Sequence, residues 1–255
     1  MVSGRLDGTV AVVTGASSGI GNATARALAA QGAGVALFAR RRDKLEDLAR
    51  EIGDMSGAGP ASVHEVDVTD ADAVREAVDG VVRDRGQLDV LVNNAGYGTM
   101  DPAMDADLGE WQKMVDVNLN GVLATTHAAV GHLARAARGS RGIADVVTVS
   151  SVAGRSVTGP GSNVYAATKH AVNAFSEALR QEFASKHVRI GLVEPGLVDT
   201  ELTNSGRENT PDASSATDLG VIEAEDIADA VVYIVTRPRR TAVNEVLIRP
   251  TEQEN

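Results

Sequence analysis

The chain is poor in several residue types, and each shortage excludes a class of function. It has no cysteine among 255 residues, which excludes disulfides, thiolate catalysis and cysteine-ligated zinc. Its five histidines are scattered without the spacing of metal ligands. A formal net charge of −11 argues against nucleic acid or an anionic membrane as the main partner. We therefore expect no resident metal, no nucleic-acid partner and no membrane partner.

Long hydrophobic runs are also missing. No stretch approaches the roughly 18 apolar residues of a membrane helix, and residues 1–5 lead into the first apolar run without the core of a signal peptide. The sequence therefore predicts a cytoplasmic protein. With 43% hydrophobic residues the chain can bury one substantial core, which predicts a single domain over residues 1–255.

Apolar β-branched runs alternate with amphipathic segments along the chain. This alternation predicts a doubly wound parallel α/β sheet of about seven strands joined by right-handed crossovers, with helices on both faces. A sheet of this kind binds its ligand beyond the carboxyl ends of its strands. The strands are predicted near 10–14, 34–39, 61–67, 88–93, 143–150, 188–194 and 243–249. The helices are predicted near 19–31, 42–52, 70–84, 107–137, 163–186 and 223–236.

A glycine-rich turn lies between the first predicted strand and the first predicted helix. Residues 14–21 read Thr-Gly-Ala-Ser-Ser-Gly-Ile-Gly. The glycines let the backbone turn tightly and approach a pyrophosphate, and the helix N-terminus adds N–H groups and a positive dipole end. This strand–turn–helix order favours a dinucleotide site over an ordinary loop. The candidate binding residues are Gly15, Ser17, Ser18, Gly19, Ile20 and Gly21.

Tyr165 and Lys169 lie four residues apart in a predicted helix, and therefore on one face of it. A phenol titrates near ~10 in water, which makes it a poor proton donor or acceptor at neutral pH. An ammonium about 4 Å away is worth ~1–4 kcal/mol, so we expect Lys169 to lower the pKa of Tyr165 by about one to three units. Alone, this spacing is more typical of a half-buried tyrosine beside a solvated lysine.

Further motifs occur in the same order as in one known family. They are Asn93-Asn94-Ala95-Gly96, Asn118 within Val-Asn-Leu, Ser150-Ser151, and Pro195-Gly196. With the glycine-rich turn and the Tyr-x-x-x-Lys pair, they cover about residues 6–250 and resemble the short-chain dehydrogenases/reductases. The resemblance implies a Rossmann-type fold and hydride transfer between a nicotinamide cofactor and a carbonyl or alcohol. Segments 172–177, 193–196 and 245–251 resemble an actinobacterial subgroup of aldehyde reductases that includes the clavulanic-acid-pathway enzyme.

The choice of cofactor is argued from the end of the second predicted strand. Enzymes that use NAD commonly place an acid there, whereas an arginine accommodates the 2′-phosphate of NADP. This chain has Ala39 at the acidic position and Arg40 next to it, which predicts NADP(H). Arg41 and Arg42 are expected to extend into solvent. The resemblance adds further cofactor contacts at Asp67, Val68, Asn94, Ala95, Gly96, Tyr165, Lys169, Pro195, Gly196, Val198 and Thr200, with Asn93 in the same segment.

The resemblance also assigns a catalytic set, which matches Asn118, Ser151, Tyr165 and Lys169 residue by residue. Ser151 is expected to donate a hydrogen bond to the substrate oxygen as negative charge develops there. Tyr165 is expected to deliver the proton. Lys169 is expected to hold the nicotinamide ribose, and Asn118 to anchor a water that passes protons to Lys169.

One departure from the family pattern concerns Ser151. It lies fourteen residues before Tyr165, one more than the commonest spacing, and the intervening segment 155–162 is loop-like. We interpret this as one inserted loop residue. Ser150 would lengthen the gap further, and Val152 has no donor, so Ser151 remains the choice. The altered loop lies on the expected substrate side, which weakens any analogy about the substrate.

The substrate itself has no signature in the sequence. Residues 203–220, within a predicted substrate lid near 197–222, are rich in Ser, Thr, Asn, Asp and Gly. The resemblance implies a small aldehyde, ketone or alcohol, and a homotetramer or homodimer built through the helices at 107–137 and 163–186.

Three alternatives remain open. The first is an NADP(H)-binding sensor or scaffold without turnover, which would not need all four catalytic residues. The second is an NAD-dependent alcohol dehydrogenase. The third is an epimerase or dehydratase of the longer family branch, which the length and the glycine spacing disfavour.

Overall fold

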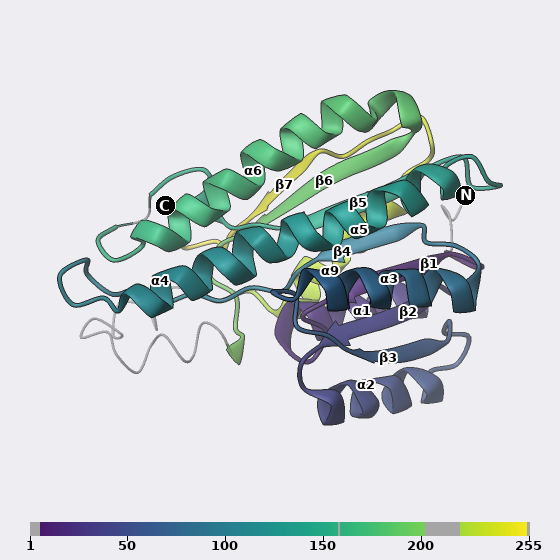
Figure 1. Ribbon diagram of the computed structural model, residues 1–255, viewed down its shortest axis with the longest axis horizontal. Coiled ribbons are helices and arrows are strands. Elements are labelled where there is room, and N and C mark those ends of the chain that lie inside the picture. Colours follow the sequence, from purple (N-terminus) through teal and green to yellow (C-terminus); the bar gives the residue numbers. More distant parts are fainter. Residues whose placement is uncertain (1–5, 158, 202–219, 254–255) are drawn as a thin grey trace.

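The computed structural model describes residues 6–157, 159–201 and 220–253. Within them, parallel strands form one sheet in the order β3-β2-β1-β4-β5-β6-β7 (Figure 1). The strands are β1 (Val10–Thr14), β2 (Gly34–Ala39), β3 (Ala61–Glu65), β4 (Val90–Asn93), β5 (Ala144–Val149), β6 (Val188–Pro195) and β7 (Glu245–Ile248). The predicted seven-stranded, doubly wound parallel sheet is confirmed.

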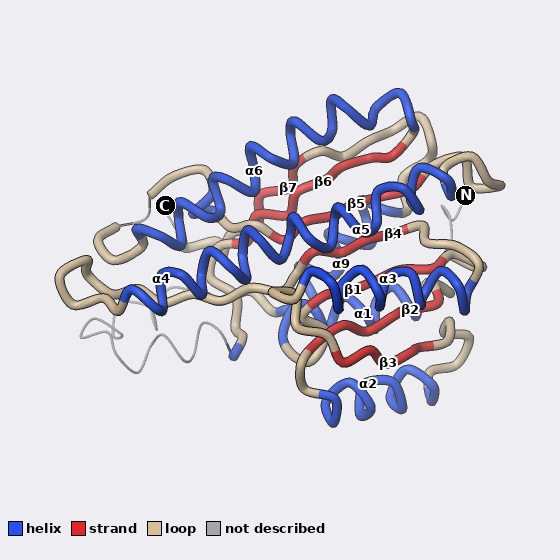
Figure 2. The backbone as a smooth tube through the Cα atoms, viewed as in Figure 1, coloured by secondary structure: helices blue, strands red, loops and turns tan. Residues whose placement is uncertain are grey.

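Helices cover both faces of the sheet (Figure 2). They are α1 (Gly19–Ala30), α2 (Arg42–Asp54), α3 (Ala71–Arg85), α4 (Leu108–Val115), α5 (Gly121–Ala136), α6 (Asn163–Phe183) and α9 (Ala224–Val235). Helices α1, α2 and α9 share one apolar cluster with the strands, and α3, α5 and α6 share the other. Among the residues described, no helix has both the length and the apolar character that a membrane crossing requires.

The central strands are buried along their whole length, because helices cover them on both sides. Every residue of β1, β2 and β5 is buried. This explains why these strands read as continuous apolar runs instead of alternating polar and apolar residues. Local signals then fix the helix ends. The Asp70 carboxylate accepts the N–H groups of Asp72 and Ala73 at 3.1 and 2.9 Å, and α3 stops at Gly86 with φ of 83°.

The helix predicted over 107–137 is not a continuous α-helix. A π-helical turn at Asp116–Asn120 separates α4 from α5, although the two remain in line in Figure 1. A π turn holds an extra residue and often marks a functional position. Here it brings the Asn118 amide to the backbone of Tyr97. The apolar periodicity of the sequence continues through this turn, so it carried no signal of the interruption.

One further difference from the prediction concerns the end of helix α6. The helix predicted to reach residue 186 ends at Phe183 and is followed by a 3₁₀ turn at Ala184–Lys186. Most of the predicted lid, residues 202–219, lies outside the described residues. The flanks of that segment are joined: Asp199 N–H donates to Ile222 O at 3.0 Å, and Ile222 N–H donates to Leu197 O at 3.1 Å.

Candidate active site

A cavity of about 550 Å³ lies over the carboxyl ends of the strands. This volume is typical of a small-molecule or cofactor site, for which about 300–1,000 Å³ is usual. Two predicted site residues, Gly21 and Asn118, do not line the cavity. The predicted residues that line it are Gly15, Ser17, Ser18, Gly19, Ile20, Arg40, Asp67, Val68, Asn94, Ala95, Gly96, Ser151, Tyr165, Lys169, Pro195, Gly196, Val198 and Thr200.

The glycine-rich turn is held against the end of β4. Thr14 Oγ1 accepts the N–H groups of Asn94 and Ala95 at 2.9 and 3.1 Å. Gly15 has φ of 66°, and a Cβ there would lie 2.9 Å from Ala95 Cα. A Cβ at Gly21 would collide with the backbone oxygen of Gly15 and the amide of Asn94. Glycine is therefore required at both positions, because the two turns pass so close to each other.

The N-terminus of α1 opens into the cavity. Ser18 is its N-cap residue, yet its side chain makes no capping hydrogen bond to the helix. The first N–H groups of a helix and its positive dipole end form a natural anion site. Ser17, Ser18 and Gly19 line the cavity at this point. The glycine turn and the helix N-terminus together fit the pyrophosphate of a dinucleotide.

Two arginines after β2 face this part of the cavity. Arg40 is 69% exposed and lies 4.0 Å from the Asp67 carboxylate. Arg41 is partly exposed, as predicted, but its guanidinium also has partners within the protein. Its guanidinium donates to Ser17 Oγ at 3.1 Å, to Ser18 Oγ at 2.8 Å and to the Glu201 carboxylate at 3.0 Å. Sequence reasoning missed Arg41 because a run of arginines gives no indication of which one folds back. Arg42 pairs with Glu46 on α2, as an exposed charge does.

Ser151 and Tyr165 meet at the wall of the cavity. Both side chains line it. Burial raises the pKa of Tyr165, and the Ser151 hydroxyl opposes that rise. The expectation that Lys169 lowers the pKa of this phenol is therefore not met in the structure. The Lys169 Nζ lies 5.6 Å from the centre of the Tyr165 ring. At that distance burial decides the direction of the shift.

Lys169 is buried one helical turn after Tyr165. Its Nζ donates to the backbone oxygen of Val149, at the end of β5, at 3.1 Å. Burial lowers the pKa of Lys169 to about 8. The ammonium therefore titrates closer to neutral pH than that of an ordinary lysine, and it lines the cavity.

Asn118 braces the site from behind. Its Oδ1 accepts the Tyr97 N–H at 2.8 Å, and its Nδ2 donates to Tyr97 O at 2.8 Å and to Thr168 Oγ1 at 3.2 Å. Thr168 Oγ1 in turn donates to the backbone oxygen of Tyr165 at 2.7 Å. The side chain therefore contacts Tyr97 and the helix that carries Tyr165. Its predicted part in a water path to Lys169 stays a prediction.

Two residues near the predicted set have structural roles. Asn93 points away from the cavity: its amide donates to Thr126 and accepts from Thr125, both on α5. It therefore fixes the helix to the sheet. Gly98, in contrast, was missed, because no sequence signal distinguishes it from an ordinary loop glycine. A Cβ at Gly98 would lie 3.0 Å from Cδ2 of the Tyr165 ring, so this glycine sets the space available to that ring.

Metal chemistry has no visible basis in the described part of the chain. Among those residues, no group of three or more histidine, cysteine or carboxylate side chains is placed to hold a metal ion.

Comparison with known proteins agrees with this geometry. The family model described as short chain dehydrogenase matches residues 9–211. An uncharacterized oxidoreductase of Staphylococcus saprophyticus is 38% identical over 251 residues, which cover 96% of each chain. An alcohol dehydrogenase of Thermococcus sibiricus, complexed with 5-hydroxy-NADP, has a TM-score of 0.85 at 32% identity over 97% of this chain and 98% of its own.

A third relative binds the other nicotinamide cofactor. The 3-ketoacyl-(acyl-carrier-protein) reductase of Brucella melitensis, complexed with NADH, has a TM-score of 0.81 at 28% identity and covers 96% of this chain and 98% of its own. The shared fold therefore does not by itself decide the cofactor. The fold, the matched residues 9–211 and the full-length relatives agree, and the chain belongs to the short-chain dehydrogenase family of oxidoreductases.

Proposed function

We propose that the chain is an NADP(H)-dependent oxidoreductase that transfers hydride between nicotinamide and the carbonyl or alcohol of a small molecule, with Tyr165 as general acid and base. The observation that carries this proposal is that Ser151, Tyr165 and Lys169 line one cavity, with the Ser151 hydroxyl lowering the pKa of the phenol and Lys169 buried one turn further on. The same cavity extends over the glycine-rich turn and the N-terminus of α1.

The roles of the residues follow from the charge that develops during reduction. Bound NADPH supplies the hydride. Ser151 donates a hydrogen bond to the substrate oxygen, which stabilises the negative charge forming there. Tyr165 donates its proton to the same oxygen, and the raised pKa of the buried phenol keeps that proton in place at neutral pH. Lys169 holds the ribose and favours the ionised phenol after proton transfer, while Asn118 fixes the helix that carries both.

The proposed preference for NADP(H) depends on two arginines. Ala39 leaves no carboxylate at the end of β2 to bind a ribose 2′-hydroxyl. Arg40 and Arg41 line the cavity beside Ser17 and Ser18, where their guanidinium groups suit a 2′-phosphate. Arg41 is held in place by its bonds to both serines.

Cofactor titration tests this preference. Nicotinamide fluorescence is followed while NADPH or NADH is added to the wild type and to Arg40→Asp. NADPH is expected to bind at least about tenfold more tightly than NADH, a difference of ~1.4 kcal/mol, and the variant is expected to reverse the order. Equal affinities would instead favour the NAD-dependent alcohol dehydrogenase. The Arg42→Asp variant is a matched control, since Arg42 pairs with Glu46.

Replacement of Tyr165 by phenylalanine separates an enzyme from a sensor. The ring and its packing against Gly98 remain, while the proton donor is lost. Turnover of aldehydes and ketones is expected to fall by about 10²-fold or more, with NADPH affinity unchanged. Tyr233→Phe serves as control, because Tyr233 is 50% exposed on α9. Unaffected turnover in Tyr165→Phe would refute the mechanism, and a wild type that binds NADPH but reduces nothing would indicate a sensor or scaffold.

Further details of this proposal come from the family resemblance. We propose a small aldehyde, ketone or alcohol as substrate, in the manner of the actinobacterial aldehyde reductases, and one catalytic domain over residues 1–255. We also propose a homodimer or homotetramer. Location in the cytoplasm stays a prediction from the sequence.

A further inference from the structure

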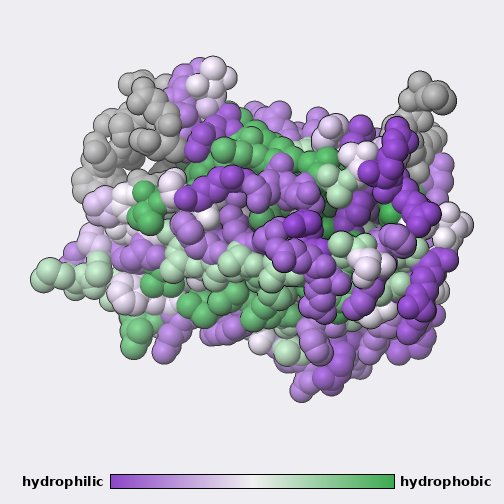
Figure 3. Space-filling model, turned by 90° about the horizontal axis from the view of Figure 1, so that it is seen from above, coloured by the Kyte–Doolittle hydropathy of each residue, from purple (hydrophilic) through white to green (hydrophobic). Residues whose placement is uncertain are grey.

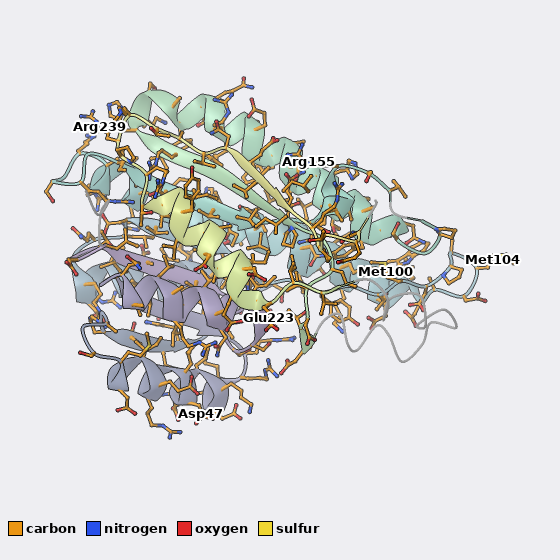
Figure 4. The ribbon with its side chains drawn as sticks, turned by 180° about the vertical axis from the view of Figure 1, so that it is seen from behind. Asp47, Met100, Met104, Arg155, Glu223 and Arg239 are labelled. Atoms are coloured by element: carbon orange, nitrogen blue, oxygen red, sulfur yellow. The ribbon has the colours of Figure 1, made fainter. Side chains whose placement is uncertain are left out.

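Glu194, near the end of β6, is a fully buried carboxylate that the proposed mechanism does not use. Arg155 Nε donates to Glu194 Oε2 at 2.7 Å, and Asn173 Nδ2 donates to Glu194 Oε1 at 2.8 Å. Arg155 also pairs with Glu245 and lies beside β7 in the view from behind (Figure 4). A buried charge needs such partners, because removal from water strongly disfavours it. Its position next to the loop that carries Ser151 suggests a role there.

Asn173 connects this carboxylate to both sides of Ser151. Its Oδ1 accepts the hydroxyl of Ser150 at 2.6 Å, and its Nδ2 also donates to the backbone oxygen of Gly154 at 3.2 Å. All three bonds need the amide in one orientation, with Nδ2 toward Glu194. The carboxylate therefore decides which way the amide faces, because only the NH₂ end can donate to it.

The segment between these two contacts is a short 3₁₀ turn at Val152–Gly154. Ser151 Oγ accepts the N–H of Ala153 at 3.1 Å, and Gly154 N–H donates to Ser151 O at 2.9 Å. The direction of the Ser151 hydroxyl thus depends on where this turn lies. Asn173 holds the turn at Gly154 and the residue before it at Ser150.

The contact between the turn and Asn173 is close enough to require glycine. A Cβ at Gly154 would lie 2.8 Å from Asn173 Nδ2 and 2.8 Å from Ser150 Oγ. No side chain fits between the Val152–Gly154 turn and the Asn173 amide. A displacement of Asn173 therefore displaces the turn as well.

Asn173 also shares a helix face with two of the predicted catalytic residues. Tyr165, Lys169 and Asn173 are spaced by four residues along α6, which places them on one side of the helix. The amide is therefore fixed relative to the Tyr165 phenol by the helix itself. One side chain thus ties the Ser151 loop to the helix of Tyr165. An error of about 1 Å in such a pair can lower a rate by ~10²-fold.

We propose that Asn173, oriented by the buried Glu194, is a positioning residue that sets the Ser151 hydroxyl relative to Tyr165. This inference rests on the proposed carbonyl reduction. Arg155 places a positive charge beside the buried Glu194 carboxyl group, and hydrogen bonds to Glu194 and Glu245 raise the pKa of Arg155.

A double-mutant cycle tests whether Asn173 acts through Ser151. Asn173→Ala is expected to lower kcat by about 10-fold or more in the wild type and by at most about 2-fold in a Ser151→Ala background. The affinity for NADPH is expected to stay unchanged, because the glycine-rich turn is not part of the network. Losses that multiply fully in the double variant would overturn the proposal. Asn173→Ser is made in parallel, so that poor folding of the alanine variant does not end the test.

A second pair of variants tests whether Glu194 orients the Asn173 amide. Asn173→Asp keeps the shape but loses both donors and faces Glu194 with a like charge, so kcat is expected to fall. Adding Glu194→Gln removes that charge and supplies an NH₂ group toward residue 173. The double variant is expected to regain at least about threefold in kcat over Asn173→Asp. No gain would overturn the part of the proposal that concerns Glu194.

Hydrogen exchange provides a readout that does not depend on turnover. Amides of residues 150–156 are expected to exchange faster in Asn173→Ala, with residues 15–21 unchanged. Gln181→Ala, on an exposed part of α6, is the matched control and should change neither segment. Unchanged exchange at 150–156 would overturn the bracing role. If the wild type reduced no carbonyl compound, the proposed function would fail, while the exchange data would still judge the contact between Asn173 and the loop.

Discussion

At the scale of single residues, Lys169 shows how burial can be traced to a measurable dependence on pH. Burial lowers its pKa to about 8, against 10.5 as the ordinary value. Below pH 8 the ammonium is charged in the folded and in the unfolded state, so the folded protein bears the full free-energy cost of burying that charge. As the pH rises from 8 to 10.5, the folded state releases its proton first and the penalty is relieved.

We therefore expect the free energy of unfolding of the wild type, relative to Lys169→Met, to rise by about 3 kcal/mol between pH 7 and pH 10.5. Urea titrations of both proteins without cofactor measure this difference. Lys186→Met removes an exposed lysine and controls for the general effect of alkali. A difference that stays constant over this range would show that Lys169 is not held in a desolvated position.

Gly21 makes a second prediction at this scale. Its Cβ would meet the Gly15 oxygen and the Asn94 amide, so Gly21→Ala must displace the glycine-rich turn. NADPH affinity is expected to fall at least tenfold, or by ~1.4 kcal/mol. Gly53→Ala on α2 is the control, because a Cβ at Gly53 meets nothing within 4 Å. Fluorescence titration compares the two, and equal affinities would contradict the close contact.

The sequence predicted the site well where a motif has reactive side chains at a fixed spacing. Ser151, Tyr165 and Lys169 line one cavity as the sequence predicts. The direction of the Tyr165 pKa shift could not be predicted, because it depends on how deeply the phenol is buried. Arg41 could not be predicted either, since its partners Ser17 and Glu201 are distant in sequence. A single sequence gives no distances between such residues.

At the scale of elements, β5 and β6 are joined at their amino-terminal ends, far from the cavity. Asp145, fully buried on β5, receives Arg189 Nε at 2.7 Å and Arg189 Nη2 at 3.1 Å. Arg141 contacts the same carboxylate at 2.7 Å. Arg189 also donates to the backbone oxygen of Val235, the last residue of α9, at 3.1 Å, and to backbone oxygens beyond that helix. The network therefore ties two strands to the end of a helix.

Arg189→Met is expected to lower the free energy of unfolding by about 3–5 kcal/mol, because it leaves Asp145 buried with part of its compensation removed. The kcat of the protein that remains folded should be unchanged, since the network lies at the amino-terminal ends of the strands and Tyr165 lines the cavity over their carboxyl ends. Denaturant titration and steady-state assays measure the two quantities. Arg180→Met breaks only an exposed pair with Glu177 and should have little effect. A stability equal to the wild type would contradict the assigned role.

Elements were predictable to the extent that their signals are local. The buried strands and the capped helices agree with the sequence to within a few residues. The π turn at Asp116–Asn120 was not predictable, because it goes with hydrogen bonds between Asn118 and Tyr97, a contact that the sequence alone does not show. The spacing of apolar residues indicates which side of a helix faces the core. This spacing is nearly the same in an α-helix that contains one π turn, so it does not reveal the turn.

At the scale of the whole molecule, apolar side chains remain on the surface. Viewed from above, green hydrophobic residues gather between purple polar ones (Figure 3). Exposed apolar residues include Leu123 on α5 and Leu247 on β7. Met104, 99% exposed, lies at the far end of a projection in Figure 4. Such surface favours the proposed association of like chains through their long helices.

Light scattering of the purified protein is expected to give two or four times the mass of one chain. Leu123→Arg places a charge on α5 and is expected to reduce that mass at least twofold. Met104→Arg changes an exposed apolar residue outside the long helices and should leave the mass unchanged. A single-chain mass for the wild type would contradict the proposed oligomer.

The separation between the two ends of the strands has a consequence for how such a chain can diverge. The charged network around Asp145 joins the amino-terminal ends of β5 and β6, and the cavity lies over the carboxyl ends. Loops around the cavity can then accept substitutions and insertions without loosening the network that holds the strands. Residues around the cavity can therefore change to accept new substrates, while the network around Asp145 continues to stabilise the fold.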